Sequence, residues 1–158
     1  MKSQRWTLLT CIAIPLAVGA LASFLSGGGM EMFAVLKKPP LSPPGWLFPI
    51  VWTILYTLMG LASYYIYTAD VPREQKSDAL AIYGYQLVVN FLWPIFFFNF
   101  QWYLFSFFWL VLLWVLIIVM IRRFSEISRL AAWLCVPYLL WVTFAGYLNL
   151  GIWWLNRK

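Results

Sequence analysis

The chain alternates between five long apolar stretches and four more polar connections. The apolar stretches run over residues 6–26, 46–68, 79–98, 103–121 and 130–154. Each is close to the ~20 residues that an α-helix needs to cross a bilayer. A backbone in lipid must satisfy its own hydrogen bonds, and the sequence lacks the short alternating segments of a β-barrel. The pattern therefore predicts an all-α integral membrane protein, a five-helix transmembrane bundle that forms a single domain over residues 1–158.

The connections predict how these helices are arranged. The first, residues 27–45, is rich in glycine and proline, which favours a stiff and mostly extended loop. The third, around Asn99 and Trp102, is so short that the third and fourth helices should be antiparallel neighbours. Seven lysines and arginines fall on the side of the N-terminus and four on the other side. The positive-inside rule then places the N-terminus in the cytoplasm.

Polar and aromatic side chains line up along two of the predicted helices. On the third helix they recur at steps of three and four, which places them on one face: Tyr83, Gln86, Asn90, Trp93 and Phe97. The fifth helix repeats this spacing with Tyr138, Trp141, Ala145 and Asn149. The two amides of the third helix lie at membrane depth, where they either link helices or meet a ligand. The fourth helix has one serine and no amide, and we expect it to face lipid all round.

The second predicted helix adds another aromatic face, because Trp52 and Tyr56 are four residues apart. A segment that only crosses lipid needs no such residues, so they indicate recognition of a flat, apolar molecule. Together the faces predict a cavity among the second, third and fifth helices, covered by the first loop. Because lipid is itself apolar, selectivity must come from shape, ring stacking and a few polar groups. The side chains that offer this combination are Trp52, Tyr56, Asn90, Trp93 and Trp141.

Composition supports the membrane class and excludes several chemistries. The chain is 64% hydrophobic and only 10% charged, which is more apolar than a soluble domain of this size can be. It has no histidine, and Cys11 and Cys135 lie inside apolar stretches, so we expect no metal site, disulfide framework or nucleophile pair. No acidic residue lies in the middle of a predicted helix, which argues against an ion-coupled carrier. The net charge of +6 is concentrated at the ends of the apolar stretches, which indicates contact with the lipid bilayer and not with nucleic acid.

Four stretches together resemble the translocator protein family, also called tryptophan-rich sensory proteins or peripheral benzodiazepine receptors. They are KPPLSPPGWLFPIVWTILYTLMG, YQLVVNFLWPIFFF, AAWLCVPYLLWVTFAGYLN and IWWLN, in the family's order. The resemblance implies a homodimeric five-helix bundle that binds porphyrins, sterols and benzodiazepine-type or isoquinoline ligands. It also implies a pocket among helices one, two, three and five beneath the first loop. The lining positions of that pocket would be Pro43, Phe48, Trp52, Tyr56, Asn90, Trp93, Trp141 and Ala145.

This resemblance implies a membrane receptor or sensor for porphyrins and related flat ligands, with porphyrin as ligand and no resident cofactor. One alternative is a light-dependent porphyrin-degrading enzyme, because Trp52 and Trp141 match the tryptophans assigned to that reaction and are the candidate catalytic residues. The other alternative is a facilitative tetrapyrrole transporter. Lys37 and Lys38 in the first loop would meet lipid headgroups or, alternatively, the carboxylates of a porphyrin.

Two departures from the family pattern change what is expected. Many relatives carry tryptophan where this chain has Leu41, which alters how the loop covers a ring. The sterol motif of the animal proteins requires a basic residue shortly after its tyrosine. Here the next basic residue after Tyr147 is Arg157, which is too distant, so we do not expect sterol binding.

Overall fold

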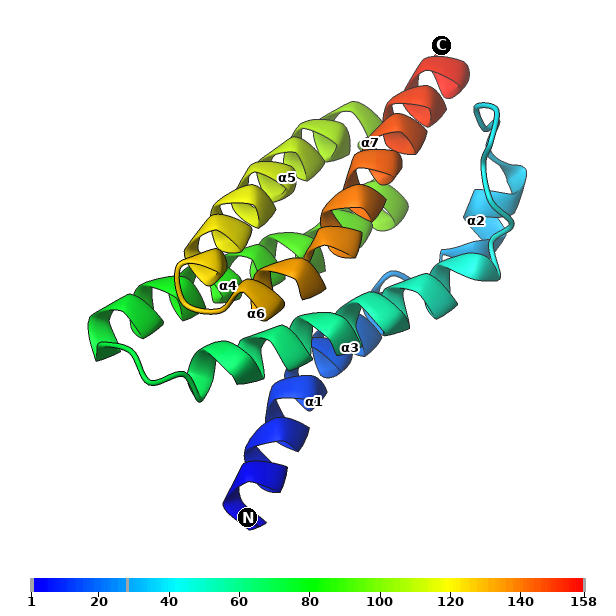
Figure 1. Ribbon diagram of the computed structural model, residues 1–158. Helices are drawn as coiled ribbons and strands as arrows, with labels where there is room; N and C mark the ends of the chain where they lie inside the picture. Colours follow the sequence, from blue (N-terminus) through cyan, green and yellow to red (C-terminus); the bar gives the residue numbers. More distant parts are fainter. Residues whose placement is uncertain (1, 28, 158) are drawn as a thin grey trace.

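The computed structural model describes residues 2–27 and 29–157, and these residues form a bundle of α-helices (Figure 1). The helices are α1 (Lys2–Leu25), α2 (Met30–Val35), α3 (Leu47–Tyr67), α4 (Arg73–Pro94), α5 (Tyr103–Ser125), α6 (Arg129–Leu134) and α7 (Val136–Asn156), with a π-helical turn η1 (Ile95–Asn99) after α4. Five segments are long and apolar enough to cross a membrane: Ser3–Leu25, Leu47–Tyr67, Arg73–Asn99, Tyr103–Ser125 and Arg129–Asn156. The predicted all-α fold with five membrane helices is therefore confirmed.

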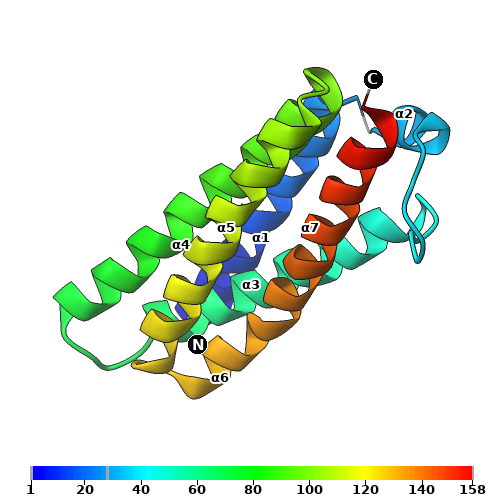
Figure 2. The same cartoon turned by 90° about the horizontal axis from the view of Figure 1, so that it is seen from above.

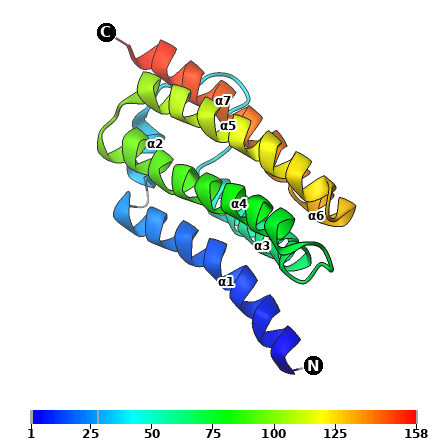
Figure 3. The ribbon, with the colours of Figure 1, turned by 90° about the vertical axis from the view of Figure 1, so that its left-hand side faces the viewer.

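Five crossings place the two ends of the chain at opposite ends of the bundle, as Figures 1 and 3 show. The main helix contacts join α1 to α3, α4 to α5, and α5 to α7. In Figure 3, α1 forms one edge of the bundle, while α5 and α7 lie at the opposite edge. The side of the membrane on which the N-terminus lies stays a prediction.

The expectation that the fourth membrane helix faces lipid all round was wrong. Helix α5 lies between α4 and α7 and buries one face, at steps of three and four: Ser106, Leu110, Leu113, Ile117, Met120 and Phe124. The core-facing and lipid-facing sides of this helix are both apolar. The sequence of α5 therefore shows no difference in hydrophobicity that would identify the buried side.

Pro94 and Pro137 lie at the ends of membrane helices. Pro94 is the last residue of α4 and precedes the π-helical turn. The first connection is not extended throughout, because Met30–Val35 forms the short helix α2. Pro137 lies in the first turn of α7, where the missing N–H has no intrahelical partner to lose. The fifth span is therefore built from α6 and α7 with a break at Cys135.

Candidate ligand-binding cavity

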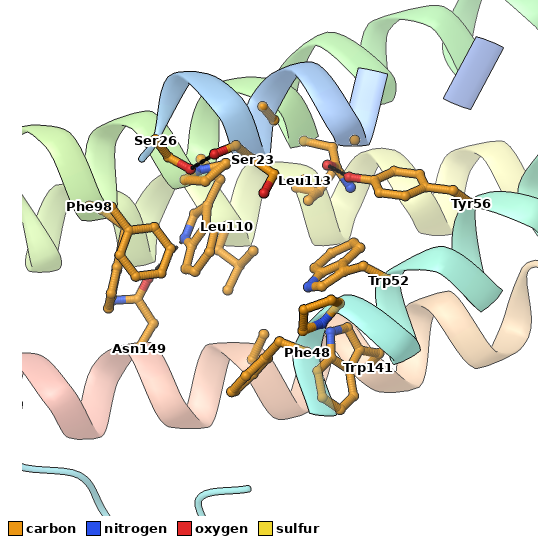
Figure 4. A pocket seen from close by; sticks show the side chains of 18 of the residues that line it. Ser23, Ser26, Phe48, Trp52, Tyr56, Phe98, Leu110, Leu113, Trp141 and Asn149 are labelled. Atoms are coloured by element: carbon orange, nitrogen blue, oxygen red, sulfur yellow. Dashed lines mark hydrogen bonds between the residues drawn. The ribbon is translucent and has the colours of Figure 1, made fainter. Parts of the chain in front are cut away.

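A cavity of about 450 Å³ lies within the bundle, and all five spans contribute to its walls. Its size falls in the range of ~300–1,000 Å³ that is usual for small-molecule sites. Aromatic side chains form much of the lining: Phe33, Phe48, Trp52, Tyr56, Trp93, Phe97, Phe98 and Trp141. Figure 4 shows Phe48, Trp52 and Trp141 grouped at one end of the cavity and Phe98 and Asn149 at the other.

The structure brings together seven of the eight residues that were expected to line a pocket. These are Phe48, Trp52, Tyr56, Asn90, Trp93, Trp141 and Ala145. Pro43 is the exception, since it is not among the lining residues. From the same first loop, residues 27–45, Phe33 of α2 lines the cavity instead and is buried against Phe48.

The polar and aromatic faces did not reveal two walls of this cavity, of which the family resemblance implied only the one on the first helix. Helix α1 contributes small residues on one face, among them Gly19, Ser23 and Ser26. Figure 4 shows Ser23 and Ser26 at the wall of the cavity. Their spacing was visible in the sequence but equally suits close helix packing. Helix α5 contributes Leu110 and Leu113. No signal distinguishes these two leucines from their lipid-facing neighbours.

A chain of hydrogen bonds borders the cavity and joins three spans. The Tyr56 hydroxyl of α3 donates to Oδ1 of Asn90 in α4, at 2.6 Å (Figure 4). Nδ2 of Asn90 donates to the Tyr138 hydroxyl of α7 at 2.7 Å, and that hydroxyl donates to Oε1 of Gln86 at 2.6 Å. All four side chains are buried. Both amides therefore link helices, and Asn90 also lines the cavity, as the polar face of the third helix predicted.

A second polar link fixes the orientation of Trp93. Its Nε1 donates to Oδ1 of Asn149 at 3.0 Å, and Nδ2 of Asn149 donates to the backbone oxygen of Tyr103 at 2.8 Å. The indole ring stacks on Phe97, with a centroid distance of 4.9 Å and an interplanar angle of 26°. This tryptophan is thereby held by contacts with α7 and η1 and presents a defined surface to the cavity.

Trp141 differs from Trp93, because its indole N–H is buried and has no hydrogen-bond partner among the described residues. Its ring packs edge to face against Phe48 at 5.7 Å. Trp52 lies near it and packs against Tyr56 at 5.5 Å. Leaving a buried donor unpaired costs about 1–3 kcal/mol. The indole N–H of Trp141 is therefore an unpaired, buried donor in a residue that lines the cavity.

The sequence model of the TspO/MBR family matches residues 11–155. The chain belongs to the TspO/MBR family. It is 38% identical to the tryptophan-rich protein TspO of Chlorobaculum tepidum over 99% of both chains. It is 36% identical to the protein CrtK of Rhodobacter capsulatus, over 87% of this chain and 85% of that one. It is 33% identical to the bovine translocator protein, over 86% of this chain and 81% of that one. With its five apolar spans, this TspO/MBR protein is an integral, multi-pass membrane protein.

Two loop residues of this TspO/MBR protein behave differently from what its sequence suggested. Leu41, where many relatives carry tryptophan, is 84% exposed and lies outside the cavity lining. Its φ of 69° is in the left-handed region, which is uncommon for a branched side chain. The ammonium of Lys38 donates to the backbone oxygens of Phe33 at 2.7 Å and Leu36 at 3.1 Å. Lys38 is thus bound to the end of α2, which leaves Lys37 as the lysine with an exposed side chain.

Proposed function

We propose that this protein is a membrane receptor or sensor that binds porphyrins and related flat, apolar ligands in the cavity. The observation that carries the proposal is the aromatic lining, in which Phe48, Trp52, Trp93 and Trp141 present rings from three spans. A ligand that leaves lipid gains little from apolar burial alone, because lipid tails are as apolar as the cavity. Stacking on several rings supplies an attraction that lipid lacks.

The polar groups of the lining complement a tetrapyrrole. The unpaired N–H of Trp141 suits a carbonyl or carboxylate oxygen. The Tyr56 hydroxyl uses its hydrogen to bond Asn90, so its oxygen remains able to accept from a pyrrole N–H. These two groups add a donor and an acceptor to a mostly apolar cavity, and they provide orientation without the high cost of burying a charge.

Replacing Trp141 or Trp52 with leucine tests this proposal. Each substitution removes a stacking surface and should weaken protoporphyrin binding by about 0.5–1.5 kcal/mol beyond the area lost. The measurement is a titration of purified protein, followed by quenching of tryptophan emission. The matched control is Trp133→Leu, because Trp133 of α6 is 70% exposed and lies outside the lining. If both cavity variants keep the affinity of the parent protein, the ligand binds elsewhere.

The position of Trp52 and Trp141 also favours a second candidate function, light-driven degradation of a bound porphyrin. Both indoles line the cavity, so a photosensitising ligand would lie beside two readily oxidised side chains. We expect no porphyrin loss in the dark. In light with oxygen, any protein-dependent loss should disappear in Trp141→Phe, which keeps a ring but lacks the indole. If porphyrin is lost no faster than free porphyrin in detergent, the enzyme function is refuted and the receptor function remains. Flux of porphyrin into sealed vesicles would instead indicate transport.

A further inference from the structure

The segment after α2 that carries Lys37, Pro39 and Pro40 lies along α7, near the C-terminal end of that helix. Figure 2 shows α2 beside the same end of α7. Three contacts hold it there. The Tyr147 hydroxyl donates to the backbone oxygen of Pro40 at 2.6 Å. The Asn156 amide donates to the backbone oxygen of Lys37 at 2.8 Å and accepts from the backbone N–H of Lys37 at 3.1 Å.

The third contact depends on a glycine. A Cβ atom at Gly151 would lie 2.6 Å from Cγ of Pro39, so only glycine lets the proline ring approach α7 this closely. Tyr147, Gly151 and Asn156 contact Pro40, Pro39 and Lys37 in that order, so the segment runs antiparallel to the helix. We call these three residues of α7 the clasp.

The clasp connects to the cavity through Lys38. This lysine lies between Lys37 and Pro39, which the clasp contacts. The Lys38 ammonium binds the backbone oxygens at the end of α2 and lies 4.8 Å from the centre of the Phe33 ring. Phe33 is 7% exposed, lines the cavity and packs edge to face against Phe48 at 5.0 Å. A displacement of the segment from α7 would therefore move the residue that covers the cavity.

The other end of α2 is joined to α1 through glycines. Gly27 and Gly29, in the connection from α1, have φ values of 66° and 67°. Glycine adopts this left-handed conformation and its alternatives at similar cost. Gly27 and Gly29 can therefore change backbone conformation without the strain that a Cβ atom would impose.

We propose that Tyr147, Gly151 and Asn156 are positioning residues that hold α2 and Phe33 over the cavity, and that release of this clasp admits and discharges the ligand. This inference rests on the proposed binding function. Ligand exchange then occurs at the end of the bundle that carries the first loop. While the three contacts are intact, the protein is mostly in the closed state, in which Phe33 lies over the cavity.

The test is stopped-flow measurement of protoporphyrin binding in reconstituted protein. Removing one hydrogen bond of the clasp in Tyr147→Phe should raise both the association and the dissociation rate constants about five-fold, with Kd changed less than two-fold. Asn156→Ala should do the same. Gly151→Ala should also accelerate exchange, although alanine favours the helix itself. A variant that merely weakened the site would change Kd instead of both rates together.

Two substitutions serve as matched controls. Tyr85→Phe removes the hydroxyl of a tyrosine that is 63% exposed, and Gly146→Ala places a Cβ in α7 that meets only Phe107, at an ordinary 3.9 Å. Both should leave the two rate constants unchanged. Unchanged rates in all three clasp variants, with Kd retained, would overturn the clasp and indicate exchange between the helices.

Amide hydrogen exchange separates failure of the clasp from failure of the proposed function. Without ligand, the amides of residues 31–38 should exchange faster in the clasp variants than in the controls, because α2 opens more often. Absence of porphyrin binding in the parent protein would refute the proposed function. Unchanged exchange at residues 31–38 would refute the clasp, whether or not porphyrin binds.

Discussion

Replacing Gly60 with alanine is expected to destabilise the bundle by about 1–3 kcal/mol, because the new methyl group overpacks the contact between α3 and α1. A Cβ at this position would lie 2.6 Å from both the backbone oxygen of Cys11 and Cα of Ile12. These are backbone atoms, which cannot rotate aside as a side chain could. Helix α1 must move away as a whole, and α3 is its main neighbour. Thermal unfolding in detergent measures the effect.

Gly84→Ala is the matched control for this experiment. Gly84 also lies inside a membrane span, but a Cβ there meets nothing within 4 Å. Alanine favours helix over glycine by about 0.5–1 kcal/mol, so this variant should be as stable as the parent protein or more so. A Gly60→Ala protein that unfolds at or above the temperature of Gly84→Ala would show that α1 and α3 do not require this close approach. Because α1 forms one wall of the cavity, we also expect Gly60→Ala to bind ligand less tightly.

Replacing Ala145 with leucine is expected to reduce the affinity for bulky ligands strongly while the fold stays intact. Ala145 is half-buried in α7 and lines the cavity, so a larger side chain there enters the space of the ligand. An overpacked contact costs about 1–3 kcal/mol, which corresponds to roughly a 5- to 150-fold rise in Kd. Titrations with protoporphyrin and with a smaller aromatic ligand should show the greater loss for protoporphyrin.

The control for Ala145→Leu is Ala81→Leu, since Ala81 is exposed on α4 and lies outside the cavity lining. Both variants add the same side chain to a membrane helix, and both should unfold near the temperature of the parent protein. Only the cavity variant should lose affinity. Full retention of protoporphyrin binding by folded Ala145→Leu protein would remove this part of α7 from the binding site.

Spacing along the third and fifth predicted helices gave the correct faces, because those faces contrast with their surroundings. Gln86 and Asn90 are amides in apolar stretches, and a polar group at membrane depth must find a partner. That requirement brought Tyr56, Asn90, Tyr138 and Gln86 into one hydrogen-bonded chain. Trp93, three residues after Asn90, and Trp141, three residues after Tyr138, then followed onto the walls of the cavity.

Where the sequence has no such contrast, the prediction failed or was incomplete. Helix α5 is apolar on every side, so its buried face could not be distinguished from its lipid-facing one. In the first loop, Pro43 was expected to line the cavity, but Phe33 of α2 takes that role. The proline pattern indicates stiffness, whereas the direction of the segment depends on Tyr147, Gly151 and Asn156, which lie more than one hundred residues away.

The sequence by itself determined the number and approximate limits of the membrane spans, the all-α fold and the family. These properties depend on the length of apolar stretches and on residues that are neighbours in the chain, so they can be recognised locally. Tertiary structure alone decided which residue covers the cavity, which side of α5 is buried, and how Tyr147, Gly151 and Asn156 hold the first loop. In a membrane, core and surroundings are equally apolar, so hydrophobicity does not mark the inside of the bundle. Shape complementarity and a few hydrogen bonds between distant residues determine it instead.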